Sequence, residues 1–463
     1  MKKVIYTLLL FVSLSGCSRY LDIKPYGVTV PKTPEEFSAL LQYHLNFIDE
    51  GRDMYLVGNT SNSLFMDMYA DDFESALYTT STNLLPISIK GELEINYSRT
   101  TPYQTLYQII RDCNIVISEL GNDGSDLART IYGTAYGMRS VAYYQLMRLY
   151  CEAPEAGRFS SQKGLPIVQV YDIEAQIPRS DLQSLINFIE SDFDKALSYN
   201  VTDASYYFTA EVIKGYKARL YHWTQQWEKA HELSKELLAA HPLLHASAFA
   251  EMIKETSHKG NYLIRNPRLI YDLNDDNRIE LLSTRPLSRR YTALYSGETE
   301  KDIRAKIYFD TRRIVKRSVS AGLRSAELAL ILAEALYHMG QEAQALEVIN
   351  DFRAHRIEGH TPYTSATLPE ASPLEYIKKD AMGRDVTPLL SLILSERRKE
   401  FLLEGDRFFE LKRNGSPEFW KAYNGERYDM LKFMYTLPIP LRDIALQESL
   451  EQNPEYENFT LGR

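Results

Sequence analysis

Apolar residues recur every three to four positions through residues 101–150, and this spacing restricts that part of the chain to amphipathic helices. Helix-capping residues agree with the pattern, because Ser180 or Asp181 suits a helix start and Gly340 suits a helix end. The predicted helices are 101–120, 125–150, 181–197, 210–221, 227–239, 325–339, 343–355 and 388–404. The expected fold class is mainly α with little β structure.

Two of these stretches share a helix–turn–helix pattern. In the first, Ala218–His222 precede a helix that starts at Trp227, and in the second, Ala335–His338 precede Gly340 and a further alanine-rich helix. Small residues at the crossing and an aromatic near the turn resemble tetratricopeptide pairs. The copies are separated in the sequence and differ by one residue in spacing, so we expect degenerate repeats within one domain.

The N-terminus has the three parts of an export signal. Lys2 and Lys3 precede an apolar run, Val4–Leu14, which Ser15, Gly16 and Cys17 follow. This order resembles a bacterial lipobox, so residues 1–16 are predicted to be a lipoprotein signal peptide and Cys17 the lipidated residue. An ordinary secretory signal with a chance cysteine is the alternative. Several acyl chains on Cys17 would anchor the protein stably at a membrane.

Composition excludes several classes of protein. Three cysteines among 463 residues do not make a disulfide scaffold, and a net charge of -9 disfavours general nucleic-acid binding. The chain has no G-x-S-x-G, H-E-x-x-H, P-loop or G-x-G-x-x-G motif, so neither a catalytic residue nor a metal site is predicted. Cys113 and Cys151 fall in or at the end of apolar helices, which favours free buried thiols.

A charged segment spans residues 396–413 and invites a catalytic interpretation. Glu396, Glu400 and Glu404 recur at helical spacing among arginines and apolar residues. Buried charges persist only when they are paired, and guanidinium groups suit carboxylates. The segment therefore predicts a partly buried ion-pair network with a structural role.

The chain resembles the SusD/RagB-like family of outer-membrane nutrient-binding lipoproteins of Bacteroidetes. The matching segments run in order over nearly the whole length and are most specific in the charged segment. They are Tyr20–Pro25, Tyr103–Asn114, Gly137–Pro154, Leu165–Val168, Pro178–Ser180, Lys217–Arg219, Asp302–Arg304, Arg324–Arg356, Glu396–Arg413, Leu437–Pro440 and Gln452–Tyr456. Glu410, Asn414 and Tyr103 depart from the residues common in that family.

The resemblance implies a single domain, residues 17–463, with a helical scaffold at approximately 98–240, 321–356 and 386–413. It implies ligand-binding loops at approximately 60–103, 241–320 and 357–385, which we expect to be long and irregular. It further implies a non-enzymatic, surface-exposed, lipid-anchored protein of the outer membrane. Such a protein captures an oligosaccharide and delivers it to a TonB-dependent, SusC-like transporter.

Two alternatives stay open. The cargo of the same fold and partner could be a peptide, as in the RagB branch, because residues 285–290 are rich in arginine. A lipid-anchored glycoside hydrolase is the second alternative, with the acid pair Asp71 and Asp72 as its feature, although adjacent residues rarely point into one cleft.

Candidate ligand contacts follow from the loops that the resemblance assigns to the ligand surface. An exposed tyrosine offers a flat apolar face and a hydroxyl group, which suits a sugar ring. Of the 33 tyrosines, those at helical spacing, such as Tyr136, Tyr143 and Tyr150, are expected to pack the core. The predicted ligand-binding residues are Asp71, Asp72, Tyr97, Tyr103, Arg290, Tyr291 and Tyr295.

No cofactor is expected. Asp272, Asn274 and Asp276 begin like a calcium loop, but position six is Asn277 and position twelve is Ser283. A calcium loop has glycine and glutamate there, so calcium is only an alternative.

Overall fold

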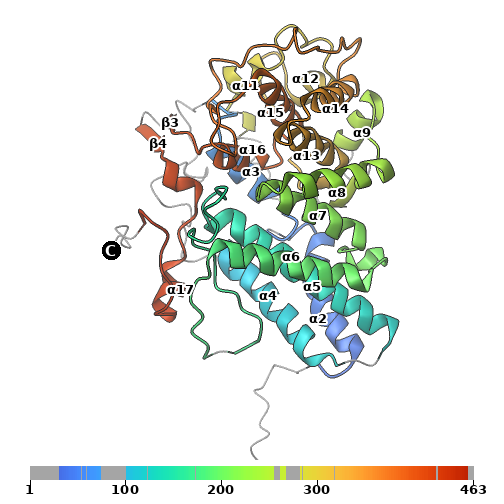
Figure 1. The fold of residues 1–463 in the computed structure, drawn as a ribbon, viewed down its shortest axis with the longest axis vertical. Helices are drawn as coiled ribbons and strands as arrows, with labels where there is room; N and C mark the ends of the chain where they lie inside the picture. The colour runs from blue at the N-terminus through green and yellow to red at the C-terminus, as the bar shows by residue number, and fades with distance from the viewer. Residues whose placement is uncertain are drawn as a thin grey trace, which may run out of the picture.

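The computed structural model is an elongated, mainly helical molecule (Figure 1). It describes residues 31–53, 55–58, 60–74, 101–121, 124–172, 174–254, 261–266, 282–283, 285–317, 319–423 and 426–456. The predicted signal peptide, Cys17 and the Asp272–Asp276 segment lie outside these ranges. No helix in the described ranges is both long and apolar enough to cross a membrane.

Antiparallel helices form the lower half of the molecule in Figure 1. The long helix α5 packs between its neighbours α4 and α6, and α2 lies across it. Gly133 and Gly137 let the chain after α6 pack closely on α5, since a Cβ at these positions would lie 2.5 Å from the Val201 side chain and 2.7 Å from that of Ile213. The bounds are α2 Pro34–Asp49, α3 Thr60–Tyr69, α4 Pro102–Glu119, α5 Asp126–Tyr150 and α6 Leu182–Tyr199.

The two predicted tetratricopeptide-like pairs are present. They are α7 (Ala210–Trp223) with α8 (Trp227–Ala240), and α13 (Ser325–His338) with α14 (Glu342–Ala354). Although they are far apart in the sequence, the pairs stack through α8 and α13. Trp227 lies parallel to His338 with ring centroids 4.1 Å apart, and His222 bonds to Glu334 at 2.8 Å. Both histidines therefore contribute to the packing of one helix pair against the other.

The charged segment folds into two helices. Helix α15 (Pro388–Glu400) ends four residues before its predicted limit, and α16 (Asp406–Arg413) follows a tight turn. Gly405 precedes α16 with φ of 72°, a left-handed conformation that favours glycine. Leu403 also has a positive φ, which explains why one continuous helix cannot form.

The expectation of irregular structure throughout 241–320 is wrong. Its described residues include three short helices and a strand, and β1 pairs antiparallel with β2 just beyond the region. Short elements of four to nine residues carry too little periodicity to be recognised. The bounds are α9 Ala246–Lys254, β1 Tyr262–Arg265, α11 Arg289–Ala293, α12 Ile303–Tyr308 and β2 Gly322–Arg324.

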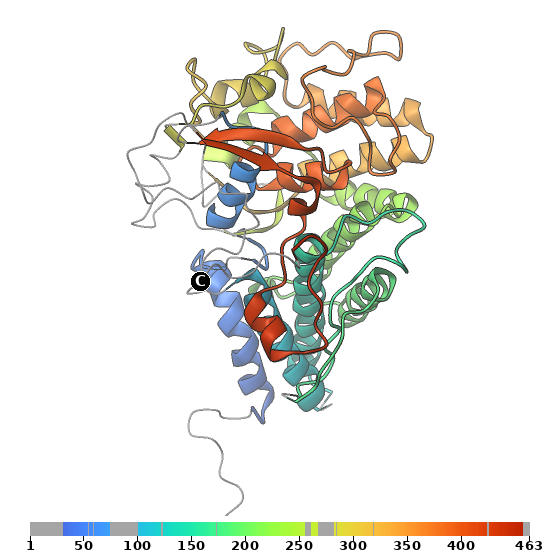
Figure 2. The same ribbon diagram turned by 90° about the vertical axis from the view of Figure 1, so that its left-hand side faces the viewer.

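A β-hairpin near the C-terminus was not predicted. Strands β3 (Phe419–Tyr423) and β4 (Glu426–Met430) pair in register, with Trp420 opposite Asp429. Figure 2 shows the hairpin in front of α3. The chain then passes through a 3-10 turn at Lys432–Tyr435 to α17 (Leu441–Leu446).

Cys113 and Cys151 are buried free thiols, as expected. Tyr143 and Tyr150 are fully buried in the main core, and Tyr136 packs against it. The regular tyrosines on α5 therefore serve packing.

Candidate functional site

The charged helices α15 and α16 form a buried network of ion pairs. Glu400 accepts hydrogen bonds from Arg324 at 2.6 Å and from Arg356 at 2.9 Å, and Arg304 contacts Glu396 at 2.6 Å. All of these side chains are at most 2% exposed. Burial alone would raise the pKa of Glu400, but the surrounding guanidinium groups lower it far below its usual range. The predicted structural role is confirmed.

Asp71 and Asp72 belong to an extension of this network. Arg407 Nε donates to Asp71 at 2.7 Å, and Arg398 Nε donates to Asp72 at 2.7 Å. Glu375 joins both arginines, at 2.7 Å from Arg398 and 2.5 Å from Arg407. The two aspartates are 3% and 1% exposed. The expectation that they face a ligand is wrong, because their carboxylates are enclosed and already paired.

The two aspartates differ electrostatically. Burial opposes the charge of Asp71, but Arg398 and Arg407 hold its pKa well below the usual range. Burial raises the pKa of Asp72, and the neighbouring Asp71 charge adds to that rise. This arrangement does not resemble a glycosidase pair, in which the two carboxyl groups face a sugar across open space.

The structure brings the stems of two predicted ligand loops together. Phe73 and Leu287 form an isolated antiparallel bridge, and Glu74 N donates to the Pro286 carbonyl at 2.8 Å. Ser288 N donates to the Asp72 carbonyl at 2.7 Å. We call residues 71–74, 285–291, 375–376 and the β3–β4 hairpin the loop-base platform. Predicted loops 60–103 and 241–320 both pass through it.

Three of the predicted tyrosine contacts are inside the protein. Tyr291 and Tyr295 are 0% exposed, and their hydroxyl groups are 3.1 Å apart. Tyr103 is 5% exposed and packs edge-on against Tyr150 at 5.1 Å. The expectation of exposed rings is wrong for all three, because each ring is part of a buried hydrophobic cluster. Tyr97 lies outside the described residues.

Arg290 is the predicted contact that lies at the surface of the platform. Its guanidinium carbon is 4.2 Å from the centre of the Tyr376 ring. Tyr376 in turn stacks on Phe419 of β3, with centroids 5.0 Å apart and planes 17° from parallel. The stack joins α11, the segment before α15 and the hairpin. Both faces of the Tyr376 ring are therefore covered, and the Arg290 guanidinium is the group of this stack that can contact a ligand.

Trp420 is the exposed aromatic that the sequence reasoning missed. It is 56% exposed on β3, whereas its neighbours Phe419 and Lys421 are buried. This alternation of side chains is the signal that could have identified it. Arg427 lies 5.4 Å from the centre of the indole and also contacts Asp429 at 2.6 Å. An aromatic face flanked by polar groups is an arrangement that can bind a sugar.

Lys421 attaches the hairpin to the C-terminal end of α3. Its Nζ donates to the carbonyl of Met68 at 2.7 Å and to that of Ala70, at the end of α3. Burial lowers the pKa of Lys421 to about 7, although the nearby Asp71 charge opposes this shift. The hairpin is therefore attached to the helix that leads into the first loop.

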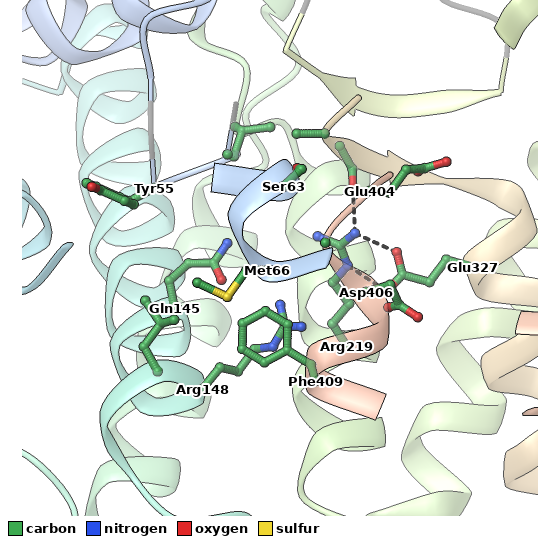
Figure 3. Close-up of a pocket in the computed structure, with 16 residues that line it drawn as sticks. Tyr55, Ser63, Met66, Gln145, Arg148, Arg219, Glu327, Glu404, Asp406 and Phe409 are labelled. Carbon is green, nitrogen blue, oxygen red and sulfur yellow. Dashed lines mark hydrogen bonds and ion pairs between the residues drawn. The ribbon is translucent and has the colours of Figure 1, made fainter. Parts of the chain in front are cut away.

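A small pocket lies between α3, α5, α7 and α16 (Figure 3). It measures about 70 Å³ and is lined by charged groups, among them Arg219, which pairs with Glu327 at 2.5 Å. Ligand pockets in proteins usually enclose about 300–1,000 Å³, so this cavity is too small for a sugar chain. Within the described ranges, no three histidine, cysteine or acidic side chains are grouped as a metal site would require.

Comparison with known protein families finds matches over two separate parts of the chain. A model of the SusD family matches residues 310–456, and a model described as starch-binding and associating with the outer membrane matches residues 19–221. SusD-like protein P38 of Formosa agariphila is 23% identical over 400 residues, which cover 70% of this chain and 73% of that protein.

Solved structures share the fold. A putative sugar-binding protein of Bacteroides vulgatus superposes with a TM-score of 0.67 at 17% identity, covering 93% of this chain and all of that one. A SusD superfamily protein of Bacteroides thetaiotaomicron gives 0.67 at 18% identity, with coverage of 91% and 100%. Surface glycan-binding protein A of Bacteroides fluxus gives 0.61 at 15% identity, with coverage of 92% and 100%. Because two SusD family models match in order along the chain and a curated relative is a SusD-like protein, the chain belongs to the SusD/RagB-like family.

Proposed function

We propose that this protein is a non-enzymatic glycan-binding lipoprotein at the outer-membrane surface. It captures an oligosaccharide at the loop-base platform and passes it to a TonB-dependent, SusC-like transporter. The observation that carries the binding site is Trp420, an exposed indole on a fixed hairpin beside the stems of two long loops.

The chemistry of Trp420 suits this role. An indole face packs against the C–H face of a sugar ring, while charged groups such as Arg427 and Asp429 can bond to its hydroxyls. Because β3 is paired along its length with β4, the ring is held before ligand arrives, which lowers the entropic cost of binding. A shallow site of this kind releases its cargo readily, as delivery to a transporter requires.

Membership of a family described as associating with the outer membrane supports the location. The Ser15-Gly16-Cys17 sequence supports attachment through lipid on Cys17. Replacing Cys17 with alanine is expected to release the protein from membranes into the soluble fraction. Retention of C17A in the outer membrane would exclude the lipid anchor.

Calorimetric titration of the detergent-solubilised lipoprotein with a panel of oligosaccharides tests the binding function. Trp420→Ala should weaken binding of the best ligand by about fivefold or more, as truncation of a central aromatic contact does. Tyr171→Ala is the matched control, because Tyr171 is 54% exposed on the loop between α5 and α6. Equal affinity of W420A and the unchanged protein would remove the hairpin from the site.

The two alternatives predict different results from the same preparation. If peptides bind and no oligosaccharide does, the cargo is a peptide. Shortening of a labelled glycan at turnover rates would show a hydrolase, in which case the protein would not be a carrier. The pairing of Asp71 and Asp72 with arginines argues against the second result.

A further inference from the structure

Arg289 and Arg290 differ from the arginines of α15 and α16 that contact the platform. Arg398 and Arg407 are buried and bonded to Asp71, Asp72 and Glu375. By contrast, neither Arg289 nor Arg290 forms a side-chain ion pair or hydrogen bond with any residue in the described ranges. Arg289 is exposed and Arg290 is half-buried. Among the described residues, these two adjacent positive charges thus have no carboxylate partner where the two loop stems meet.

The guanidinium of Arg290 is nevertheless fixed in position. It lies on Tyr376, which lies on Phe419, so that a column of two rings supports it from the hairpin. A cation–π contact uses the flat face of the guanidinium and leaves its N–H edge free to donate. Because the side chain is already ordered, little rotamer entropy is lost when that edge binds a ligand.

The charge of this site runs against that of the whole protein. The chain has 62 acidic and 53 basic residues, so its net charge is negative, whereas Arg289 and Arg290 are both positive. A neutral sugar gains little from a full positive charge. A carboxylate or sulfate group matches the planar fork of arginine and forms short, charge-assisted hydrogen bonds with it.

We infer that the cargo is an anionic glycan, whose carboxylate or sulfate groups bind Arg289 and Arg290. The inference rests on the proposed function and specifies its ligand class. Trp420 is a separate contact, because successive residues of a strand point to opposite faces, and Phe419, which supports Arg290, is buried whereas Trp420 is exposed.

Ligands that differ only in charge separate the effect of ligand charge on binding from the effect of ligand shape. We would titrate the detergent-solubilised lipoprotein with an oligogalacturonide and its methyl ester, and with a sulfated galactan oligosaccharide and its desulfated form. At least one anionic member should bind about tenfold or more tightly than its neutral partner, as hydrogen bonds to charged groups do. The first pair tests carboxylates and the second tests sulfates.

Variants assign that difference to the arginines. Arg289→Gln and Arg290→Gln should each reduce binding of the preferred anionic ligand several-fold and leave binding of its neutral partner unchanged. Arg129→Gln is the matched control, because Arg129 is exposed on α5 and also lacks a carboxylate partner within the described ranges. Thermal melts would verify that each variant folds. If Arg290→Gln does not fold, Arg289→Gln still tests the proposal, because it leaves the stack of Arg290, Tyr376 and Phe419 in place.

Each remaining outcome decides against one proposal or both. Equal binding of charged and neutral partners, or equal losses for both in R289Q and R290Q, overturns the anionic cargo and leaves glycan binding intact. Binding of a hexaglutamate peptide without binding of any glycan overturns both proposals. So does the absence of binding by every glycan in the two panels.

Discussion

The Asp71 carboxylate accepts a hydrogen bond from Arg407 Nε at 2.7 Å, although 336 residues separate the two in the sequence. Arg398 lies beside them, 3.0 Å from Asp71 and 2.7 Å from Asp72. This contact ties the stem of the first loop to the charged helices α15 and α16. The base from which the loops extend is therefore connected to the helical scaffold by buried ion pairs.

Removing the Asp71 charge should destabilise the protein. In Asp71→Asn, Arg398 and Arg407 would remain buried with one fewer counter-charge, which typically costs about 3–5 kcal/mol. The midpoint of urea unfolding, followed by circular dichroism, measures the loss. Asp385→Asn is the control, because Asp385 pairs with Lys379 while 87% of its side chain is exposed. Its expected cost is below about 1 kcal/mol, and equal midpoints for the two variants would show that the buried pair adds no stability.

Tyr291 should act on stability through its ring. Tyr291→Ala would leave a large cavity in a 0% exposed site, with an expected cost of about 3–5 kcal/mol. Tyr291→Phe removes only the hydroxyl, which is 3.1 Å from that of Tyr295, and should cost about 1 kcal/mol. Thermal melts compare the two. A fully stable Y291A with weakened glycan binding would instead return this residue to the ligand surface.

Two constraints favour glycine at position 405: a left-handed backbone conformation and the close approach of Ser63. Comparison with a second glycine separates them. Alanine at position 405 would adopt φ of 72° and bring its Cβ to 3.1 Å from Ser63 Cα, while the backbone N–H bonds to Asp67 at 3.0 Å. Gly297→Ala shares only the first constraint, since φ is 80° and no atom lies within 4 Å. The conformational cost is about 1–2 kcal/mol in both. Chemical denaturation should show a larger loss for G405A, and equal losses would mean that α3 moves aside freely.

Lys412 should make stability depend on pH. Its Nζ donates to the carbonyls of Arg148 and Cys151, and burial lowers its pKa to about 7. The unfolded chain, with a lysine pKa of about 10.4, binds a proton that the folded chain has released between pH 7 and 10. The lysine therefore costs stability most below pH 7, and this cost declines as the pH rises.

Lys412→Met removes that dependence whatever its effect on absolute stability. Between pH 7 and 9 the unchanged protein should gain about 1.4 kcal/mol per pH unit relative to the variant. Urea midpoints across the pH series provide the comparison, and Lys235→Met is the control because Lys235 is exposed on α8. Parallel curves for K412M and the unchanged protein would contradict a lowered pKa.

The long helices could be predicted from the sequence because each needs only local information. The periodic segments 101–120, 125–150 and 181–197 match α4, α5 and α6 within two residues at either end. The pairing of Glu396 and Glu400 with arginines was also predictable, since the alternative is an unpaired buried charge. The hairpin escaped prediction because its five-residue strands are too short for a reliable pattern.

The candidate site was much harder to predict. Asp71, Asp72, Tyr291 and Tyr295 look like polar loop residues in the sequence, yet all four are buried. Their burial depends on segments that pack over them from elsewhere, such as Arg398 and Arg407 on the aspartates. Sequence spacing carries no information about such distant partners.

The sequence by itself determined the helical class of the fold, the repeat-like helix pairs and the need for paired charges in residues 396–413, because periodicity and charge balance act locally. Only the tertiary structure decided which side chains remain at the surface. Long-range contacts buried the predicted acids and tyrosines, and the pleat of a short hairpin turned Trp420 outward. Exposure depends on every segment that packs against a residue, which is why it could not be read from local sequence.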